Sequence, residues 1–454
     1  MLKRMVTIVK EFSVSKKNTI LRGTFILTMT GFLSRVMGFF YRIFMSRVFG
    51  EEGVGLYQLV FPVYSLCIAL SIAGTETAIS RTVARKRSIG REDEAQEVLF
   101  CGLSFSLLLS CLCMVILRKY TGFFASELLG DPRCESLLEI IACTLPFCAV
   151  HSCISGYYYG SRETKVPAAS QLIEQTARIL SVYILYYLLT RQGYQVSVSL
   201  AVCGIVIGEM CSAAYTLHSL SGKGKTMIPL CRRIRSIPGQ FRELSSLAFP
   251  LTANRILINL LQSIEAVSIP AKLQQYHHSA SEALSIYGVL NGMALPCILF
   301  PSAITNSVSV MLMPTVAEMQ AADNRQKLWE TIKKVTSACF ILGLFCCLIF
   351  LLLGPWIGTT LFGSETAGKF IVTLAWICPF LYTDSALLSV INGLGKSGST
   401  LIINTTGLLI RIAGVYLAIP RFGIQGYLWG LLLGQLVTCF LAIIVIWRNL
   451  KKIT

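Results

Sequence analysis

About a dozen long apolar segments make up most of this chain of 454 residues, and short polar stretches separate them. Each segment is long enough to cross a bilayer as a helix, which takes about 20 residues. Charged residues are 14% of the chain, against about 25% in soluble domains. Strands of a membrane barrel are shorter and alternate in polarity, which this sequence does not do. The pattern therefore predicts an all-α polytopic membrane protein.

We place twelve spans along the sequence, six on each side of the longest polar connection. They cover approximately residues 19–44, 55–79, 97–117, 136–159, 168–189, 197–219, 244–269, 284–312, 334–354, 368–392, 400–419 and 425–447. We expect an N-terminal six-helix bundle over residues 1–220, a cytoplasmic linker over 221–243 and a C-terminal six-helix bundle over 244–454.

The net charge of +17 is concentrated in the polar stretches that flank the spans. Loops on the cytoplasmic side of membrane proteins are enriched in Lys and Arg. If both termini and the even-numbered loops lie inside, those segments hold most of the 40 Lys and Arg residues. The charge therefore predicts cytoplasmic termini and contact with membrane lipid, and it does not indicate a nucleic-acid partner.

Two similar patterns in the two halves predict an internal repeat. Gly160 precedes Arg178 by 18 residues, and Gly393 precedes Arg411 by the same 18. An isoleucine follows each arginine, and each pattern begins with a turn rich in glycine and cations. The two halves have the same predicted orientation, so the repeat is expected to be parallel, with its axis along the membrane normal.

Three arginines within apolar spans are the candidate substrate-binding residues. Arg35 and Arg42 lie in the first span, seven residues apart and therefore on one helix face, and Arg255 lies in the seventh span. A guanidinium in a membrane persists where it faces the protein interior or a wet cavity. Its planar fork binds phosphate oxygens in pairs. In the alternative interpretation Arg35 pairs with Glu76 or Glu265, and Arg42 reaches the outer interface.

Other charged residues within spans are candidates for ion coupling or for structural pairing. Glu174 and Arg178 have the favourable spacing of four residues on a helix. Arg411 has no acid at that spacing, and Asp384 is its candidate partner from another span. A carboxylate that lacks a partner can carry a proton or bind sodium. These alternatives stay open for the four carboxylates outside the fifth span, which are Glu76, Glu209, Glu265 and Asp384.

No sequence motif of an enzyme is present. The chain has no Walker A motif, no nucleophile motif and no spacing typical of metal ligands. We therefore expect no enzymatic activity, no metal and no cofactor. Energy for transport would then come from a proton or sodium gradient, the membrane potential or the substrate gradient.

The run from Leu21 to Leu66, which contains SRVMGFFYR and SRVFGEEGVGLYQ, resembles the opening of polysaccharide-biosynthesis flippases. These proteins belong to the multidrug/oligosaccharidyl-lipid/polysaccharide (MOP) exporter superfamily. The stage V sporulation protein B group is the most similar branch, and the lipid II flippases are related. The resemblance covers the whole chain, including the GSR and GKS turns after spans four and ten.

The resemblance implies two helix bundles around a central cavity that opens alternately to each side, as in multidrug exporters of this superfamily (MATE). It also implies a lipid-linked saccharide diphosphate as the substrate. Lipid II flippases carry cavity arginines in their first helix, and Arg35 and Arg42 match these in place and type. The acidic residue expected in the second helix is missing, since the chain reads Gly55–Leu56–Tyr57 there. Twelve spans also leave out the pair that forms a lipid-tail groove in the lipid II flippases.

The residues and the resemblance together predict a flippase for a lipid-linked oligosaccharide in the bacterial cytoplasmic membrane. A peptidoglycan precursor such as lipid II, used in the spore cortex or elsewhere in the cell wall, is the expected substrate. Two alternatives stay open. One is a cation-coupled multidrug or small-molecule exporter of the same fold. The other is a membrane scaffold that binds cell-wall synthases and transports nothing.

Overall fold

The computed structural model describes residues 18–221, 237–322 and 325–451. Within these ranges the regular elements are all helices, with no strand. Nine of the helices described are long and apolar enough to cross a membrane, and two bent helix pairs raise the number to as many as eleven. The all-α polytopic fold is therefore confirmed, while the number twelve stays a prediction.

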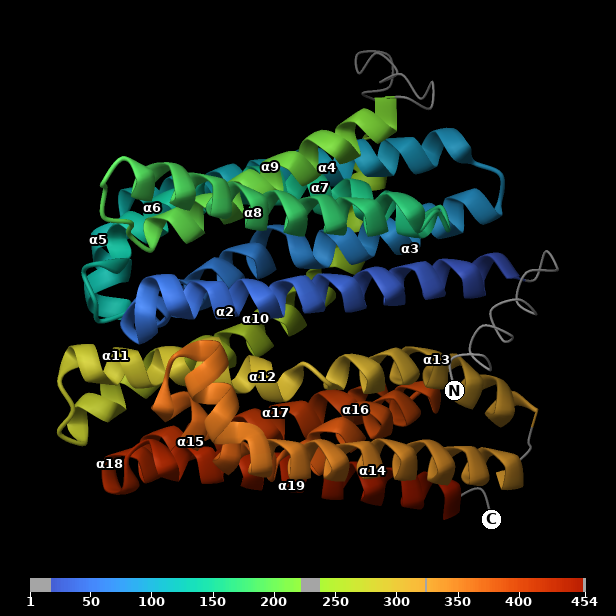
Figure 1. The fold of residues 1–454 in the computed structure, drawn as a ribbon. Coiled ribbons are helices and arrows are strands. Elements are labelled where there is room, and N and C mark those ends of the chain that lie inside the picture. Colours follow the sequence, from blue (N-terminus) through green and yellow to red (C-terminus); the bar gives the residue numbers. More distant parts are fainter. Residues whose placement is uncertain (1–17, 222–236, 323–324, 452–454) are drawn as a thin grey trace.

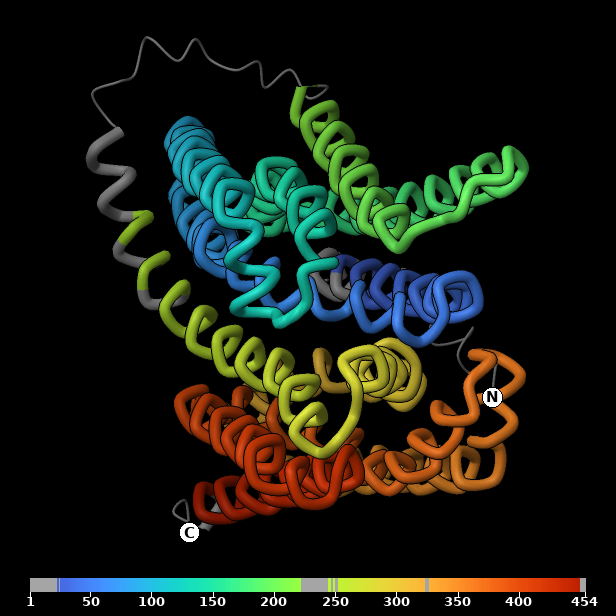
Figure 2. The backbone as a smooth tube through the Cα atoms, turned by 90° about the vertical axis from the view of Figure 1, so that its left-hand side faces the viewer, coloured from blue at the N-terminus to red at the C-terminus, as the bar shows by residue number. Residues whose placement is uncertain are grey.

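The helices form two layers that lie one above the other in Figure 1, and Figure 2 views the same layers from one end. The first layer contains α2 (Asn18–Ile68), α3 (Gly74–Ser88), α4 (Glu92–Lys119), α5 (Thr121–Phe123), α6 (Cys134–Ala142), α7 (Thr144–Gly160), α8 (Lys165–Arg191) and α9 (Ser199–Ser221). The second layer contains α11 (Ala280–Gly288), α12 (Leu295–Leu299), α13 (Ser302–Ala321), α14 (Arg325–Ile357), α15 (Glu365–Ala375), α16 (Cys378–Gly393), α17 (Ser397–Ala413), α18 (Ile419–Phe422) and α19 (Ile424–Lys451).

Helix α10 (Ile237–Gln275) connects the two layers (Figure 2). It packs against α3 and α4 of the first layer and against α17 and α18 of the second. It begins inside the range expected for the linker, and residues 222–236 of that linker lie outside the described residues. Among the described residues, five short π-helical segments interrupt or extend the other helices, namely η1 (Ala69–Ala73), η2 (Phe124–Leu128), η4 (Val289–Ala294), η5 (Gly358–Phe362) and η6 (Gly414–Ala418).

Helix α2 contains two of the expected spans. It runs for 51 residues, which is far longer than the roughly 20 that cross a bilayer. Gly50 lies within it at φ 69° and ψ −177°, a conformation outside the helical region. Residues with a Cβ rarely adopt a positive φ, so glycine is suited to this position. Helix α2 turns back on itself, and the end of the molecule where it does so, which also carries α5, α11 and α18 in Figure 1, is called the Gly50 end below.

The structure confirms the internal repeat. Corresponding features in the two layers are separated by 233 positions. These are Gly55 and Gly288, the positive-φ residues Gly130 and Gly363, Gly160 and Gly393, the positive-φ residues Arg162 and Gly395, and Arg178 and Arg411. A Cβ at Gly160 would lie 2.9 Å from Val83 Cβ, and a Cβ at Gly393 would lie 2.9 Å from Val316 Cβ. The two layers therefore repeat the same packing, and not only the same order of helices.

The repeat brings two equivalent glycines together where the layers meet. A Cβ on Gly288 of α11 would lie 2.8 Å from Gly55 Cα of α2, so the backbones are in contact. Two copies of one position touch each other when they lie on the symmetry axis that relates them. The axis of the repeat therefore passes between α2 and α11. We call this contact, together with that of α2 on η4, the seam between the layers.

Candidate functional site: intramembrane charges

The two candidate arginines of the first span have different surroundings. Arg42 is half-buried, and its Nη1 donates a hydrogen bond to the carbonyl oxygen of Asn291 at 3.2 Å. Asn291 belongs to η4 of the second layer, so Arg42 lies in the seam between the layers. Arg35 is exposed two turns earlier on the same helix. It forms no ion pair with any residue that the structure describes, so its pairing with Glu76 or Glu265 is not observed.

Arg255 is exposed on α10, the helix that connects the layers. Its charge is close enough to that of Glu76, at the start of α3, for the two to attract each other. Arg255 is thus one of the groups near enough to attract Glu76, together with His151 of α7. A guanidinium that is exposed within an apolar helix can attract an anion.

The first layer contains a buried group of charges where α7, α8 and α9 meet. Arg178 donates a hydrogen bond from Nη2 to Glu174 on the preceding turn of α8, as the spacing predicted. His151 of α7 has its Nδ1 3.5 Å from Oε2 of Glu209 in α9. Ligand atoms of His151, Glu174 and Glu209 all lie within 4.8 Å of one another. These contacts bring Glu174, Arg178 and Glu209 into one group. The group also contains His151, which the sequence had not placed there.

A second buried group of charges joins α10 to the second layer. Arg411 of α17 donates a hydrogen bond from Nε to Oε1 of Glu265 in α10 at 2.7 Å. The hydroxyl of Tyr427 in α19 donates to the same oxygen at 2.7 Å. The prediction that Asp384 is the partner of Arg411 was wrong. Asp384 lies instead beside Gln435 and 3.9 Å from the Cys439 sulfur.

The repeat explains why the two groups are built differently. The motif GxxxG followed by a polar residue occurs as Gly204 to Glu209 in α9 and as Gly430 to Gln435 in α19. His151 corresponds to Asp384 at the separation of 233 positions, and Glu174 corresponds to Gly407. Since Gly407 offers Arg411 no carboxylate on its own helix, Glu265 of α10 supplies it. The acid of the second layer therefore comes from the connecting helix.

The two layers are also joined by polar contacts at the Gly50 end. Arg47 of α2 donates from Nε to the carbonyl of Leu361 at 2.9 Å and from Nη2 to the carbonyls of Thr359 and Thr360. These carbonyls belong to η5, which follows α14. A cation beside the carbonyl end of a helix is favourable. These hydrogen bonds connect the first layer to the second.

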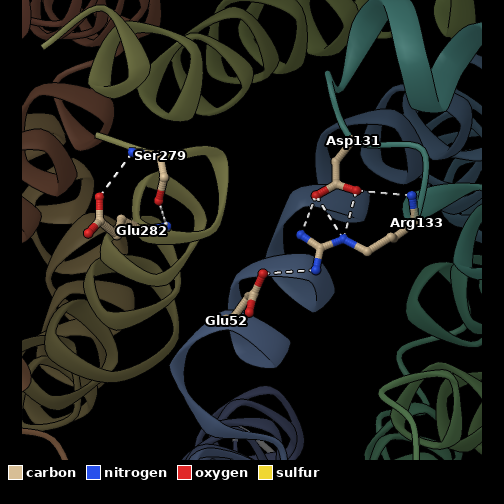
Figure 3. A network of polar contacts seen from close by, with 5 residues as sticks. All are labelled: Glu52, Asp131, Arg133, Ser279 and Glu282. Atoms are coloured by element: carbon tan, nitrogen blue, oxygen red, sulfur yellow. Dashed lines mark hydrogen bonds and ion pairs between the residues drawn. The ribbon is translucent and has the colours of Figure 1, made fainter. Parts of the chain in front are cut away.

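Figure 3 shows a second polar network at this end. Arg133 forms ion pairs with Asp131 at 2.7 Å and with Glu52, which follows Gly50 in α2, at 2.8 Å. These contacts raise the pKa of Arg133 above its ordinary value. Nearby, the Ser279 hydroxyl accepts from the amide of Glu282, and the Glu282 carboxylate accepts from the amide of Ser279. This capping box defines where α11 begins.

The sequence did not predict that His151, Tyr427 and Arg47 take part in these contacts. No local signal connects His151 to Glu209 or Tyr427 to Glu265, because each pair is separated by more than fifty residues. The correspondence of His151 with Asp384 through the repeat is a usable signal, since both residues are polar and lie within apolar spans. This correspondence links positions 151 and 384 through the sequence alone.

Comparisons with known proteins identify the family and the fold. Residues 20–320 match the family model described as polysaccharide biosynthesis protein. The chain is 26% identical to stage V sporulation protein B of Bacillus subtilis, over 94% of this chain and 83% of the relative. It is 23% identical to the lipid II flippase MurJ of the same organism, over 95% of this chain and 83% of that protein.

Solved structures share the fold at lower identity. A lipid II flippase MurJ in an inward closed conformation superposes with a TM-score of 0.73 at 13% identity, over 94% of this chain and 90% of that one. An inward-facing MATE multidrug transporter of the MOP superfamily gives 0.70 at 16% identity, over 97% and 99%. The chain is a multi-pass membrane protein with the fold of the MOP superfamily, and it belongs to the polysaccharide biosynthesis protein family.

Proposed function

We propose that the protein is a flippase that carries a lipid-linked saccharide pyrophosphate from the cytoplasmic to the outer leaflet of the bacterial plasma membrane. The observation that carries this proposal is the set of intramembrane guanidiniums at and beside the junction of the two layers. Arg42 lies in the seam, Arg35 is exposed on the same helix, and Arg255 is exposed on the helix that connects the layers. The similarity to stage V sporulation protein B and to MurJ supports the same function.

The charge and the fold suit an anionic amphiphile. Moving a diphosphate through hydrocarbon without compensation is prohibitive, and fixed guanidiniums replace its hydration with charge-assisted hydrogen bonds. The lipid tail stays in the bilayer while the sugar and diphosphate cross between the layers. Alternating access then requires the layers to rock about the seam. Two contacts would hold the Gly50 end closed in the state that the structure shows. One joins Arg47 to η5, and the other joins Gly55 to Gly288.

Several parts of the proposal go beyond the fold. With both termini in the cytoplasm, as the distribution of basic residues favours, the Gly50 end faces outward. A peptidoglycan precursor such as lipid II is the proposed cargo, for the spore cortex or for the cell wall in general. We propose no bound cofactor for transport. An ion gradient, the membrane potential or the substrate gradient would drive it, and cell-wall synthases that consume the product are proposed partners.

The test is flipping of a fluorescent lipid-linked saccharide pyrophosphate in proteoliposomes that contain the full-length protein. We expect wild-type flipping and its loss in Arg35→Ala and Arg255→Ala. Arg191→Ala, at the exposed end of α8, is the matched control and keeps full activity. Flipping that persists in both variants would refute the arginine site while leaving the function intact. No flipping by the wild type under any ion gradient would favour the scaffold.

A cation-coupled exporter is the second candidate, and the buried carboxylates favour it. Glu209 is buried in α9 and Asp384 is half-buried in α16, and such a transporter needs a carboxylate that gains and loses a cation. The same liposomes, loaded with a cationic dye, distinguish the two functions. Dye export that stops in Asp384→Asn, together with absence of lipid flipping, would establish the exporter.

A further inference from the structure

The tautomer of His151 follows from its neighbour Ser170. The Ser170 hydroxyl oxygen lies 3.2 Å from His151 Nε2 and also 3.1 Å from the carbonyl of Pro167, to which it donates. A hydroxyl has one proton, so Ser170 must accept from Nε2–H. In a neutral imidazole the other nitrogen then carries a lone pair. A neutral His151 therefore presents Nδ1 as an acceptor.

This acceptor faces a second acceptor. Nδ1 lies 3.5 Å from Glu209 Oε2, and neither atom has a hydrogen-bond partner among the described residues. Glu209 is 6% exposed, so water does not solvate this carboxylate freely. Two lone pairs that face each other in a buried site are unfavourable unless a cation lies between them.

The separation of the two atoms distinguishes between kinds of cation. A proton shared between a charged imidazole and a carboxylate brings the heavy atoms to about 2.7–2.9 Å. Ligands about 2.1 Å from a tetrahedral zinc ion lie about 3.4 Å apart. The 3.5 Å between Nδ1 and Oε2 is longer than the shared-proton distance and leaves room for a metal ion, and the Glu174 oxygen, within 4.8 Å of both atoms, would move closer when the ion binds.

A third ligand and its supporting contacts are present. Glu174 offers a carboxylate oxygen within 4.8 Å of the ligand atoms of His151 and Glu209. Arg178 holds this carboxylate, and Ser170 orients the His151 ring. Metal ligands in proteins are commonly oriented by such partners, which hydrogen-bond their other polar atoms.

The charges around the site also favour a cation. Glu76, Glu174 and Glu209 contribute three negative charges, and Arg178 contributes one positive charge. Arg255 attracts Glu76 from its exposed position on α10. With Arg255 counted against Glu76, one net negative charge remains beside His151, so a cation at this place is electrostatically favourable. An imidazole with two carboxylates suits zinc and neighbouring first-row transition metals better than sodium.

We propose that His151, Glu174 and Glu209 bind one divalent transition-metal ion of the zinc class in the core of the first layer. The ion would connect α7, α8 and α9. The second layer has Asp384 and Gly407 at the separation of 233 positions and Gln435 after its own GxxxG motif, and these supply one carboxylate instead of two carboxylates and an imidazole. The site is thus specific to one layer, and it does not depend on the proposed transport activity.

The test measures metal binding by the full-length protein in detergent. Metal-free protein is dialysed against Zn²⁺ in excess Na⁺, and bound zinc is counted by mass spectrometry. Co²⁺ is used in parallel, since its visible absorption reports a tetrahedral site with a nitrogen ligand. We expect one ion per chain, at least a tenfold loss of affinity in His151→Ala and Glu209→Gln, and a loss of about 10–100-fold in Ser170→Ala. Asp384→Asn, at the position equivalent to His151, is the matched control and binds as the wild type does.

Two results would overturn the proposal. One is the absence of stoichiometric Zn²⁺ and Co²⁺ binding, with a melting temperature that responds to pH but not to metal. A protonated His151 paired with Glu209 would then occupy the site. The other is undiminished binding in His151→Ala and Glu209→Gln. Size-exclusion profiles establish that each variant is folded, and Ser170→Ala, which keeps all three ligands, tests the site if a ligand variant does not fold.

Discussion

Neutralising Glu265 is expected to destabilise the second layer strongly. One oxygen of this carboxylate accepts from both Arg411 Nε and the Tyr427 hydroxyl, each at 2.7 Å, and Glu265 is 3% exposed. In Glu265→Gln the amide oxygen can still accept from Tyr427, so the shape and one hydrogen bond remain. The guanidinium of Arg411 loses its countercharge. The variant therefore tests the ion pair and not the packing.

The structure sets the size of the effect. Removing one partner of a buried ion pair costs about 3–5 kcal/mol, because the other charge stays buried without compensation. The Arg411 side chain is 35% exposed, so water can solvate part of the remaining charge. We therefore expect the lower end of that range, about 3 kcal/mol. Each kcal/mol shifts the melting temperature by roughly 2–4 °C in domains of 150–250 residues, so a fall of several degrees is expected.

Buried cysteines provide the assay, since a thiol-reactive dye reports their exposure on unfolding. Arg411→Met removes the remaining charge, so the double variant Glu265→Gln/Arg411→Met should regain part of the lost stability. Glu282→Gln is the matched control, because glutamine preserves the exposed capping box at the start of α11. A single variant as stable as the wild type, or a double variant that loses the sum of both single effects, would refute this reasoning.

The remaining predictions concern contacts at and near the Gly50 end. Arg47→Ala should release the carbonyls of η5, and faster hydrogen exchange of the amides in residues 358–365 would show it. Gly288→Ala should destabilise the protein severely, because its Cβ would lie 2.8 Å from Gly55 Cα, whereas Gly398→Ala has open space and should have little effect on the melting temperature. Arg133→Ala should change stability by less than about 1 kcal/mol, since its ion pairs are exposed to solvent, and a larger loss in the thiol-dye assay would contradict this.

Much of the architecture could be predicted because membrane helices carry a strong local signal. A long apolar segment must form a helix in lipid, so the spans and their order follow from composition. The repeat of Gly160 and Arg178 as Gly393 and Arg411 was also visible, since a duplicated fold keeps the same residues where the same packing recurs. The ion pair of Glu174 with Arg178 was predictable because both residues lie on one helix.

Pairing between helices was not predictable in the same way. Asp384 and Glu265 were both available acids for Arg411, and nothing in their spacing distinguishes them. The path of α10 determines which acid pairs with Arg411, since it places Glu265 beside α17. The distances among His151, Glu174 and Glu209 likewise depend on how three helices pack, and a difference of a few ångströms separates a metal site from a simple ion pair.

The sequence by itself therefore determined the fold class, the repeat and the residues that carry charge inside the membrane, because hydrophobicity and helical spacing act locally along the chain. The tertiary structure decided which charges meet, which arginine lies in the seam and which stay exposed. These outcomes depend on the packing of helices far apart in sequence, where one small residue, such as Gly407 in place of a glutamate, changes which helix must supply the partner.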